Sequence, residues 1–496
     1  MNTLAQEIQA HINSHYPIIY LITQEEDQAN LLIDQVLAGD ERKKIEWNLG
    51  CGFVNYKSVN TINSWCSFTD ALENLLLQDL EQHVIIIRDA HVALTEPLAV
   101  ARLKMLVNKF FANEDAHVTI IMIGAQAYIP HELEKLITLF DLPLPNRDKI
   151  NDILTKFAHV YEIEIEQEIK QRLNYALQGL SYQEILHLLM QSYQNDGAID
   201  ENDIPLIQQQ KSQIIKKSGI LEMIEVQDKF SDIGGLYTLK PWLEKKAKII
   251  KNFTKAQQFG VEAPKGVLIA GMPGCGKSLT AKATAALFEM PLLKLDIGSI
   301  MGKYVGESEA NMRKAIKVAE AVSPSVLWVD ELEKAFVGIG QGNASSEVAT
   351  RLFGFFLTWM QEKTSQVFVI ATANDISNLP PELMRKGRFD EVFYVDFPAL
   401  QERHEIFKVH LNKRNKMNHN ISINELAEAT ENYSGADIES IIKEAIEESF
   451  IDNQAPLDTR RLRKVIKETH PLGEIMSHKV KEYKKRFEDM KIKSAS

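Results

Sequence analysis

The sequence predicts an α/β protein built from parallel sheets with helices packed on their faces. Short runs rich in Val and Ile alternate with longer amphipathic stretches over most of the 496 residues, a pattern typical of strands joined by crossover helices. A glycine-rich loop follows one of these runs, and the two halves of the chain share a similar order of segments. At roughly 100–200 residues per domain, this length accommodates two to four domains.

The apolar runs place the expected strands in two groups, one in each half of the chain. In the first half we expect strands at residues 18–23, 84–88 and 118–123. In the second half we expect strands at residues 266–270, 292–296, 326–330, 367–372 and 392–397. Residues 200–225, which contain a QQQK stretch and a KKSG turn, are interpreted as a partly helical linker between the halves.

The composition excludes several classes of protein. With 45% hydrophobic and 25% charged residues, the chain is neither collagen-like nor mainly disordered. Its three cysteines, Cys51, Cys66 and Cys275, fit neither a disulfide framework nor a zinc pattern and suit a reducing compartment. No segment reaches the ~18 apolar residues that span a bilayer, and the polar N-terminal stretch lacks the layout of a secretion signal. We therefore expect no membrane insertion and a cytoplasmic location, or the stroma if a plastid encodes the protein.

Charge is distributed unevenly along the chain. The net charge of −12 argues against a general nucleic-acid binder. Residues 457–496, however, contain twelve Lys or Arg and six Asp or Glu, a local charge of +6. Because acidic residues are interleaved with the basic ones, a solvated helix is favoured over a nucleic-acid contact. We expect a last lid helix at residues 459–468 and then a basic tail that trails away from the folded body.

Two pairs of segments suggest that one plan was duplicated. DLPLPNRDKINDIL begins at Asp141 and DFPALQERHEIFKV at Asp396, and GLSYQEIL and NYSGADIE follow later in the respective halves. An acidic residue also ends an apolar strand in each half, at Asp89 and at Asp330. Chance similarity between two α/β domains is the alternative interpretation.

The segment GMPGCGKS, Gly271–Ser278, fits the phosphate-loop pattern G-x-x-x-x-G-K-[ST]. It lies between a strand-like run and a helical run, which is the order that phosphate binding requires. Glycines let the backbone turn tightly so that its N–H groups face phosphate oxygens, and the following helix adds its positive end. Lys277 would reach the β- and γ-phosphates, and the Ser278 hydroxyl would bind Mg²⁺. The predicted nucleotide-binding residues of this loop are Gly271, Met272, Pro273, Gly274, Cys275, Gly276, Lys277, Ser278 and Leu279.

Polar residues at later strand ends suit the same site. VLWVDE ends in Asp330, predicted to act on Mg²⁺ through water, and Glu331, predicted to polarise the attacking water. VFVIATAND ends in Asn374, which could orient that water. Alone, these residues would indicate only a strand end and a turn, but their place after a phosphate loop favours catalysis. LMRKGRFD then supplies Arg385 and Arg388, which would stabilise transition-state charge, although spacing alone also allows surface arginines.

Seven motifs occur in the order of an AAA ATPase module, namely FSDIGGL, GMPGCGKS, GKYVGESEANMRKAI, VLWVDELEKA, ATAND, LMRKGRFDEVFYVDFP and YSGADIESIIKEA. Over about residues 230–450 the chain resembles the branch with proteasomal, membrane-protease and microtubule-severing ATPases. Its layout, with a first half that lacks a phosphate loop, is similar to the AAA family called hypothetical chloroplast reading frame forty-six. That family has cyanobacterial, algal-plastid and bacterial members. The resemblance implies an ATP hydrolase that uses ATP and Mg²⁺.

The resemblance assigns further roles. Residues that line the adenine pocket, or close over the nucleotide from the lid, are matched by Asp232, Ile233, Gly234, Gly435 and Ala436. His410 matches a histidine near the ribose and adenine. Arg385 and Arg388 match paired fingers that enter the neighbouring subunit's site, which implies a ring homo-oligomer, usually a hexamer. The first pore loop, where an aromatic residue grips a threaded polypeptide, is matched by Lys303, Tyr304, Val305 and Gly306.

The sequence departs from this branch in two places. Lys386 stands between the arginines where Pro is frequent. Residues 361–363 read Gln-Glu-Lys where the branch often has Asp-Gly-Phe, an intersubunit signalling turn. The second departure bears on coupling between neighbours rather than on ATP binding.

The first half carries no such site in its sequence. At the corresponding loop, residues 22–28 read ITQEEDQ, with no glycine or lysine and three acidic residues that would repel a phosphate. No glutamate follows Asp89, so we assign this half to assembly or partner binding. The predicted domains are a degenerate AAA-like domain at 1–199, the linker at 200–225, the large ATPase subdomain at 226–400, a helical lid at 401–470 and the basic tail at 471–496.

Three functions remain open from the sequence. A ring-forming remodeller or unfoldase that acts on a protein client is favoured by GKYVGE. A nucleotide-switched regulatory scaffold is favoured by the inactive first half and by the missing Asp-Gly-Phe. A nucleic-acid-associated ATPase has least support, because the protein is acidic and shows no nucleic-acid motif. No H-E-x-x-H protease signature occurs, so degradation of a client would need a partner.

Overall fold

The structure is a computed structural model that describes residues 2–58, 66–111, 117–217, 219–226, 228–300, 307–336, 344–376, 379–385, 387–453 and 455–496. The predicted pore-loop residues Lys303, Tyr304, Val305 and Gly306 lie outside these ranges, as does Lys386. The chain divides into two compact units, which are described separately. Unit 1 comprises Met1–Pro145 and Ser181–Met190, and unit 2 comprises Asn146–Leu180 and Gln191–Ser496.

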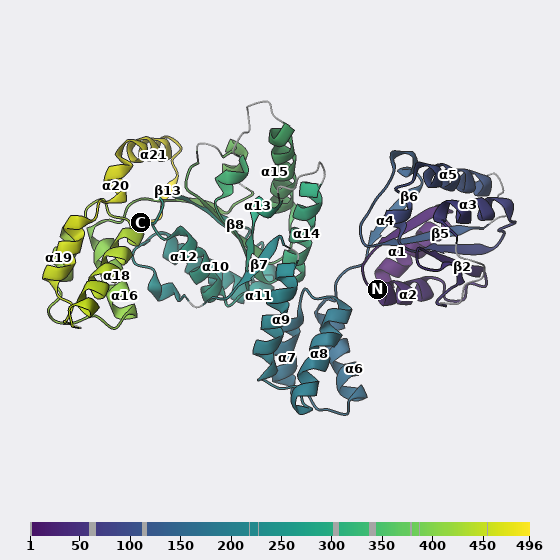
Figure 1. The fold of residues 1–496 in the computed structure, drawn as a ribbon, viewed down its shortest axis with the longest axis horizontal. Coiled ribbons are helices and arrows are strands. Elements are labelled where there is room, and N and C mark those ends of the chain that lie inside the picture. The colour runs from purple at the N-terminus through teal and green to yellow at the C-terminus, as the bar shows by residue number, and fades with distance from the viewer. Residues whose placement is uncertain are drawn as a thin grey trace. The chain divides into compact units, whose positions relative to one another are not determined.

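Unit 1, drawn in purple to blue in Figure 1, is built on a six-stranded sheet in the order β3-β2-β4-β5-β1-β6. Its strands are β1 (Ile18–Ile22), β2 (Lys43–Asn48), β3 (Gly52–Asn55), β4 (His83–Ile87), β5 (Thr119–Gly124) and β6 (Ile137–Asp141). All neighbours are parallel except β3, which runs antiparallel to β2. The three strands predicted in this half are confirmed.

Helices cover both faces of this sheet. They are α1 (Asn2–Asn13), α2 (Glu26–Val36), α3 (Phe68–Leu77), α4 (Ala90–Ala93) and α5 (Pro97–Phe111), with a 3₁₀ turn η1 at His131–Leu133. Successive residues of a strand point to opposite faces. Ile19 and Ile121 accordingly pack with α1 and α2, whereas Ile18 and Ile120 pack with α3 and α5. Strands buried on both faces read as unbroken apolar runs, which is why the sequence revealed them.

Four helices follow, α6 (Arg147–Val160), α7 (Gln167–Leu177), α8 (Tyr182–Asp196) and α9 (Asp203–Lys217). The division between the units falls within α8. The predicted linker at 200–225 is instead α9 followed by strand β7 (Leu221–Ile224), which pairs antiparallel with β9. The segment is helical in part, as expected, but it is packed rather than a free linker, because Ile204, Ile207 and Ile215 bury one face of α9.

Unit 2 contains a seven-stranded sheet in the order β13-β12-β8-β11-β10-β9-β7. The other strands are β8 (Gly266–Gly271), β9 (Leu292–Leu295), β10 (Ser325–Val329), β11 (Val367–Ala373), β12 (Glu391–Val395) and β13 (Lys493–Ser494). The five predicted strands form its parallel centre, so the expected α/β class is confirmed.

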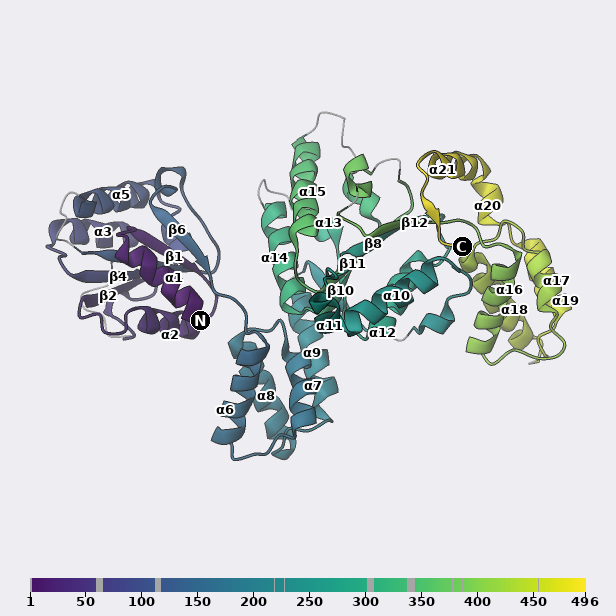
Figure 2. The same cartoon turned by 180° about the vertical axis from the view of Figure 1, so that it is seen from behind.

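Helices also lie on both faces of the second sheet. They are α10 (Leu239–Lys251), α11 (Phe253–Gln258), α12 (Lys277–Phe288), α13 (Ile297–Ile300), α14 (Glu307–Ala321) and α15 (Ala344–Glu362), with 3₁₀ turns η2 (Phe230–Asp232), η3 (Leu332–Phe336) and η4 (Pro381–Met384). Figure 2 shows α10 and α12 side by side, and both pack on one face of the sheet. Helices α14 and α15 pack on the other.

A helical lid follows the sheet, with its own apolar core. It comprises α16 (Leu400–Lys413), α17 (Ile423–Glu428), α18 (Gly435–Ile451) and α19 (Thr459–Glu468), which includes the last lid helix as predicted. At the start of α18, Ser434 and Asp437 cap each other's backbone N–H groups, which fixes where this helix begins.

The basic C-terminal segment does not trail away, contrary to the prediction for residues 471–496. Helices α20 (Leu472–Ile475) and α21 (Ser477–Asp489) return the chain to the sheet, where β13 pairs with β12. Phe487 is 4% exposed and stacks on Tyr394 with ring centroids 3.7 Å apart. Lys484 pairs with Asp396 at 2.8 Å, and Lys493 pairs with Glu391. Part of the positive charge is thus matched by acidic residues of the ATPase sheet, which a pattern confined to the tail could not reveal.

The two sheets share one topology. In chain order, the five parallel strands of unit 1 (β1, β2, β4, β5, β6) and of unit 2 (β8, β9, β10, β11, β12) both lie side by side in the order fifth, first, fourth, third, second. Each sheet also has an antiparallel edge strand next to its second parallel strand. Agreement of this order supports the duplication over a chance likeness of segments.

Candidate functional site

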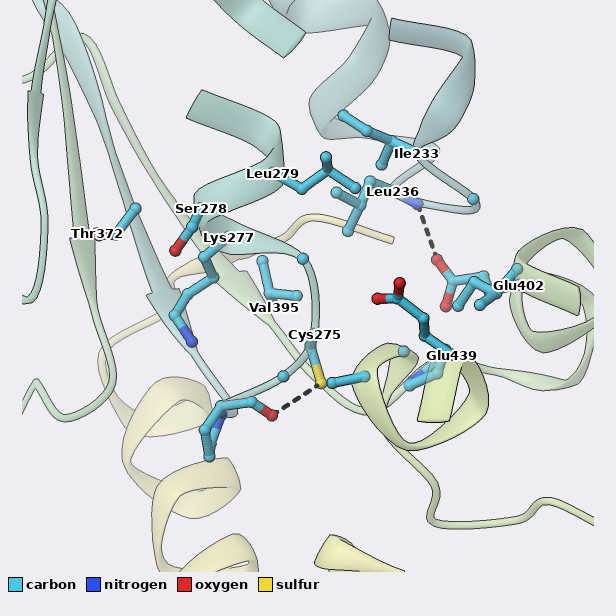
Figure 3. Close-up of a pocket in the computed structure, with 18 of the residues that line it drawn as sticks. Ile233, Leu236, Cys275, Lys277, Ser278, Leu279, Thr372, Val395, Glu402 and Glu439 are labelled. Carbon is cyan, nitrogen blue, oxygen red and sulfur yellow. Dashed lines mark hydrogen bonds between the residues drawn. The ribbon is translucent and has the colours of Figure 1, made fainter. Parts of the chain in front are cut away.

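A pocket of about 460 Å³ lies between the carboxyl ends of the ATPase strands and the lid (Figure 3). Sixteen of the residues selected from the sequence line it together, namely Asp232, Ile233, Gly234, Pro273, Gly274, Cys275, Gly276, Lys277, Ser278, Leu279, Asp330, Glu331, Asn374, His410, Gly435 and Ala436. Segments more than 200 residues apart in the chain therefore converge on one cavity.

The phosphate loop has the backbone that its glycines allow. Gly274 and Gly276 have φ angles of 75° and 87°, in the left-handed region that favours glycine. A Cβ on Gly274 would lie 2.7 Å from the Ser434 hydroxyl of the lid, so the lid approaches this loop closely. Helix α12 begins at Lys277 and directs its N-terminus at the pocket, which favours anions there.

Lys277 is held inside this loop. Its Nζ donates to the backbone carbonyls of Gly271 and Met272 at 2.9 and 2.7 Å. These two residues were also predicted to bind the nucleotide, but they are not among the residues that line the pocket, and their carbonyls position Lys277 instead. Burial lowers the pKa of Lys277 to about 8. Nearby carboxylates favour the charged amine, but their effect on the pKa is smaller than that of burial. An anionic ligand would favour the charged amine and give it new partners.

Asp330 and Glu331 follow β10 and face the pocket with Asn374 of the next strand end. Asp330 Oδ1 accepts from the Thr372 hydroxyl at 2.7 Å, and its Oδ2 lies 3.2 Å from Lys294 Nζ. Asn374 Nδ2 lies 3.5 Å from Glu331 Oε1, close enough for both side chains to contact one water. Glu331 has a left-handed φ of 51°, a backbone conformation that is uncommon for residues other than glycine.

Several polar residues of this cluster were not identified from the sequence. Glu333 Oε1 accepts from the Asn374 backbone N–H at 3.1 Å, and burial raises the pKa of Glu333. Lys334 pairs with Glu331, and Lys294 with Asp330. Thr372 could have been inferred from its place near the end of a strand, since ATAND supplies it two residues before Asn374. The remaining contacts arise only when separate strands meet.

The lid is fastened to the phosphate loop and to the segment before α10. Ala436 N–H donates to the Gly274 carbonyl at 3.0 Å. Backbone N–H groups of Gly235 and Leu236 donate to carboxylates of α16, Glu405 at 2.8 Å and Glu402 at 2.9 Å. These bonds hold the predicted adenine strip, the phosphate loop and the lid around one cavity.

His410 lies in the lid wall, where burial lowers the pKa of its ring and keeps it neutral at pH 7. Its Nδ1 lies 3.3 Å from Arg414. Arg414 in turn pairs with Glu439 at 2.7 Å, another pocket residue that the sequence did not single out.

The two arginines expected to act between subunits are placed apart from this pocket. Neither Arg385 nor Arg388 is among the described residues that line it. Arg385 is exposed after η4, and Arg388 donates to the backbone carbonyl of Glu382.

The described residues contain neither a membrane-spanning helix nor a cluster of metal-binding side chains. None of the helices in the described ranges is long and apolar enough to cross a membrane. Within the same ranges, no group of three or more His, Cys, Asp or Glu side chains is arranged to hold a metal ion by itself.

Comparison with known proteins places these features in one family. Residues 267–397 match the ATPase family associated with various cellular activities (AAA), and residues 420–470 match the AAA+ lid domain. A curated relative, the AAA domain-containing protein ycf46 of Pyropia yezoensis, is 36% identical over 473 residues, 94% of each chain. The chain belongs to the ycf46 family of AAA-domain proteins. The family member of Trieres chinensis is likewise 36% identical, over 94% of this chain and 92% of its own.

Other matches cover parts of this ycf46-family chain. The ATP-dependent zinc metalloprotease FtsH 2 of Salinibacter ruber is 32% identical over 238 residues, 46% of this chain and 34% of its own. Residues 4–142 match the N-terminal domain of SpoVK-like AAA ATPases, and residues 148–218 match their second domain. Two domains thus occupy the region that the sequence suggested as one domain at 1–199 and the start of a linker.

The connection at the phosphate-loop position is shorter in unit 1 of this ycf46-family chain than in unit 2. Only residues 23–25 separate β1 from α2, whereas residues 272–276 separate β8 from α12. Glu25 in this short connection accepts from the Gln183 backbone N–H at 2.9 Å. A carboxylate thus stands at the start of α2 in unit 1. The counterpart of α2 in unit 2 is α12, whose N-terminus would help to bind an anion.

Strand register corrects one equivalence drawn from the sequence. Ile87 pairs with Met122, and Ile22 pairs with Gly124, just as Val329 and Ala270 pair with Ala371 and Ala373 in unit 2. The counterpart of Asp330 is therefore Arg88, and Asp89 is the counterpart of Glu331. Matching left-handed φ angles of 55° and 51° at Asp89 and Glu331 support this alignment. From the sequence, Asp89 was matched with Asp330 because both are acidic residues that follow an apolar strand. The strand register shows that Asp89 lies one position further along than Asp330.

Arg88 inverts the charge at the predicted magnesium position. It is 6% exposed and pairs with Glu46 of β2 at 2.7 Å. By register, Glu46 is the counterpart of Lys294, which pairs with Asp330 in unit 2. Unit 1 retains an ion pair at these strand ends but presents a buried cation where unit 2 presents a carboxylate.

Proposed function

We propose that this AAA protein binds and hydrolyses ATP at the pocket of unit 2, and that a ring of its chains remodels a protein client. The observation that carries the hydrolytic part is the convergence of the phosphate loop, Asp330, Glu331 and Asn374 on one cavity covered by the lid. In phosphoryl transfer, catalysis rests mainly on positioning and on stabilisation of charge. The phosphate loop, with Glu331 and Asn374 beside it, supplies both.

The donor atoms suit Mg²⁺ bound together with ATP. Ser278 supplies a hydroxyl and Asp330 a carboxylate, and hard cations of this size prefer oxygen ligands with several waters retained. Bound Mg²⁺ would neutralise charge on the β- and γ-phosphates. Lys294, now 3.2 Å from Asp330, would keep that carboxylate oriented from the second strand.

The chain's own residues divide the chemical work. Lys277 would replace its bonds to two backbone carbonyls with contacts to phosphate oxygens. Glu331 would polarise the attacking water. Asn374, whose Nδ2 lies 3.5 Å from Glu331 Oε1, would hold the same water in place. Arg385 and Arg388 would stabilise the transferred charge from a neighbouring subunit, since they do not line the pocket of their own chain.

Unit 1 is assigned to assembly or partner binding rather than to a second nucleotide. Its short loop, the carboxylate of Glu25 and the buried Arg88 at the magnesium position all oppose binding of Mg²⁺ with ATP. One nucleotide per chain is the expected stoichiometry.

A nucleotide-switched scaffold is the second candidate, and one observation favours it. Lys363 stands at the end of the segment where related ATPases often have Asp-Gly-Phe, and it is buried and donates to the backbone carbonyl of Val367 in its own chain. A segment fastened in this way is less free to report nucleotide state to a neighbour. The remodeller retains the stronger case from the aromatic loop sequence around Tyr304, whose residues lie outside those described.

Glu331→Gln tests both the chemistry and the client. The amide keeps the shape of the side chain but is a poor base, so the variant should bind ATP, fail to hydrolyse it and accumulate in ATP-bound assemblies. Affinity capture of this variant with ATP should enrich a client relative to Lys277→Ala, which should not bind ATP. Hydrolysis by Glu331→Gln at the parent rate would refute the role of Glu331.

A further inference from the structure

Two carboxylates of the lid face the nucleotide pocket, Glu402 from α16 and Glu439 from α18 (Figure 3). The oxygens of Glu402 already have donors. Its Oε1 accepts from the backbone N–H of Leu236 at 2.9 Å and from the Ser496 hydroxyl at 2.7 Å, and its Oε2 accepts from the backbone N–H of Ala399 at 2.9 Å. Glu402 is only 3% exposed and holds the lid in place.

Glu439 has a different arrangement. Arg414 at 2.7 Å and Lys443 at 2.8 Å both contact its Oε1. In the part of the chain that the structure describes, no donor bonds its Oε2. Although burial raises the pKa of Glu439, hydrogen bonds from Lys443 and Arg414 bring it below the usual value, so the carboxylate is ionised at pH 7. Two cations thus orient an anionic acceptor that points into the pocket (Figure 3).

Helix α18 determines which part of a nucleotide would meet this acceptor. Ala436 at its start touches the phosphate loop through its N–H bond to Gly274. Glu439 lies three residues further on, about 4.5 Å along the axis and on the same face of the helix. His410 and the strip at Asp232–Gly234 line the pocket as well, where the base is expected. The group that joins the phosphates to the base is the ribose.

We propose that Glu439 accepts a hydrogen bond from a ribose hydroxyl of the bound nucleotide and thereby selects ribonucleotides over 2′-deoxyribonucleotides. The proposal rests on the proposed binding of adenine nucleotides at this pocket. A carboxylate that accepts from a ribose hydroxyl is an established means of reading a nucleotide sugar. A hydrogen bond to an ionised acceptor is stronger than one between neutral groups, and a deoxynucleotide would leave this acceptor without its donor.

Competition binding to the full-length chain tests the proposal without hydrolysis, with ADP, 2′-deoxy-ADP and inosine diphosphate as probes. The parent protein should bind ADP roughly ten- to hundredfold more tightly than 2′-deoxy-ADP, the range expected for one charged hydrogen bond. Glu439→Ala should lower the affinity for ADP toward that for 2′-deoxy-ADP and leave the latter almost unchanged. Glu439→Gln, which keeps a neutral acceptor of the same shape, should give an intermediate ratio. Glu444→Gln, an exposed residue of the same helix outside the pocket, should match the parent.

Four results would overturn the proposal. Equal affinities of the parent for ADP and 2′-deoxy-ADP would show that the 2′-hydroxyl is not read and that the pocket does not select ribonucleotides. Equal losses for both nucleotides in Glu439→Gln and Glu439→Ala would mean that Glu439 only supports the lid. A change confined to the ratio of ADP to inosine diphosphate would assign the carboxylate to the amino group of the base. If the parent bound none of the probes, the proposed function would fail together with this inference.

Discussion

Raising the pH from 7 to 9 should weaken nucleotide binding by about tenfold, because Lys277 loses its proton in the ligand-free protein. Burial lowers the pKa of this amine to about 8 from its usual 10.5. A pKa of about 8 leaves about nine-tenths of the amines charged at pH 7 and about one-tenth at pH 9. Since phosphate oxygens require the charged form, affinity should fall with the charged fraction, and the free protein should take up a proton on binding.

Calorimetric titration with Mg²⁺ and a non-hydrolysable ATP analogue, in buffers of different ionisation heat, measures both quantities. At pH 8 the uptake should be about half a proton per nucleotide bound. Folding has the opposite dependence. The unfolded chain, with the higher lysine pKa, binds more protons between about pH 8 and 10.5, so this group makes the ligand-free fold more stable as pH rises through that window.

A matched control separates Lys277 from other buried amines. Burial also lowers the pKa of Lys363 to about 8, yet Lys363 does not line the pocket. Lys363→Met should therefore keep the full pH dependence of nucleotide binding. Constant affinity of the parent between pH 7 and 9, with no proton uptake, would show that the carbonyls of Gly271 and Met272 keep Lys277 charged and would refute the reasoning.

Three further predictions concern other parts of the chain. Mixing Arg385→Ala chains with Glu331→Gln chains should partly restore hydrolysis, because each supplies what the other lacks across a subunit boundary; no recovery in demonstrably mixed assemblies would confine the arginine to its own chain. Burial raises the pKa of Cys275 to about 12, so its thiol should resist alkylation at pH 8 until denaturant unfolds the protein, and rapid modification of the folded chain would contradict this. Phe487→Ala should cost about 3 kcal/mol in the free energy of urea unfolding, whereas Met490→Ala, at a side chain 47% exposed, should cost little; equal losses would mean that the tail is not packed on the sheet.

The sequence was most informative where a function depends on consecutive residues. The phosphate loop, Asp330 with Glu331, and Asn374 could be identified because each motif lies at a strand end, and the central strands are unbroken apolar runs. Glu439 and Glu402 were missed because their meaning comes from partners on other helices and before α10. No local pattern distinguishes such residues from ordinary solvated acids.

Edge elements were missed for a related reason. The edge strand β3, with the sequence GFVN, is only four residues long, and the edge strand β13 is only two residues long. A short edge strand gains its hydrogen bonds and its cover from a neighbour that is distant in the chain, so its own composition is a weak guide. The basic tail was judged by its charge, whereas Phe487 and Lys484 find Tyr394 and Asp396 on the sheet.

The ion pairs at the second and third parallel strands connect fold to function. Both units place opposite charges there, Lys294 with Asp330 and Glu46 with Arg88, so an ion pair at this position is compatible with either active or inactive chemistry. Only the order of the charges differs. A carboxylate after the third strand can meet a cation that accompanies a nucleotide, whereas a buried guanidinium at the same place repels one. On the proposed assignment, loss of the site in unit 1 required no change of topology, because the two sheets keep the same order of parallel strands.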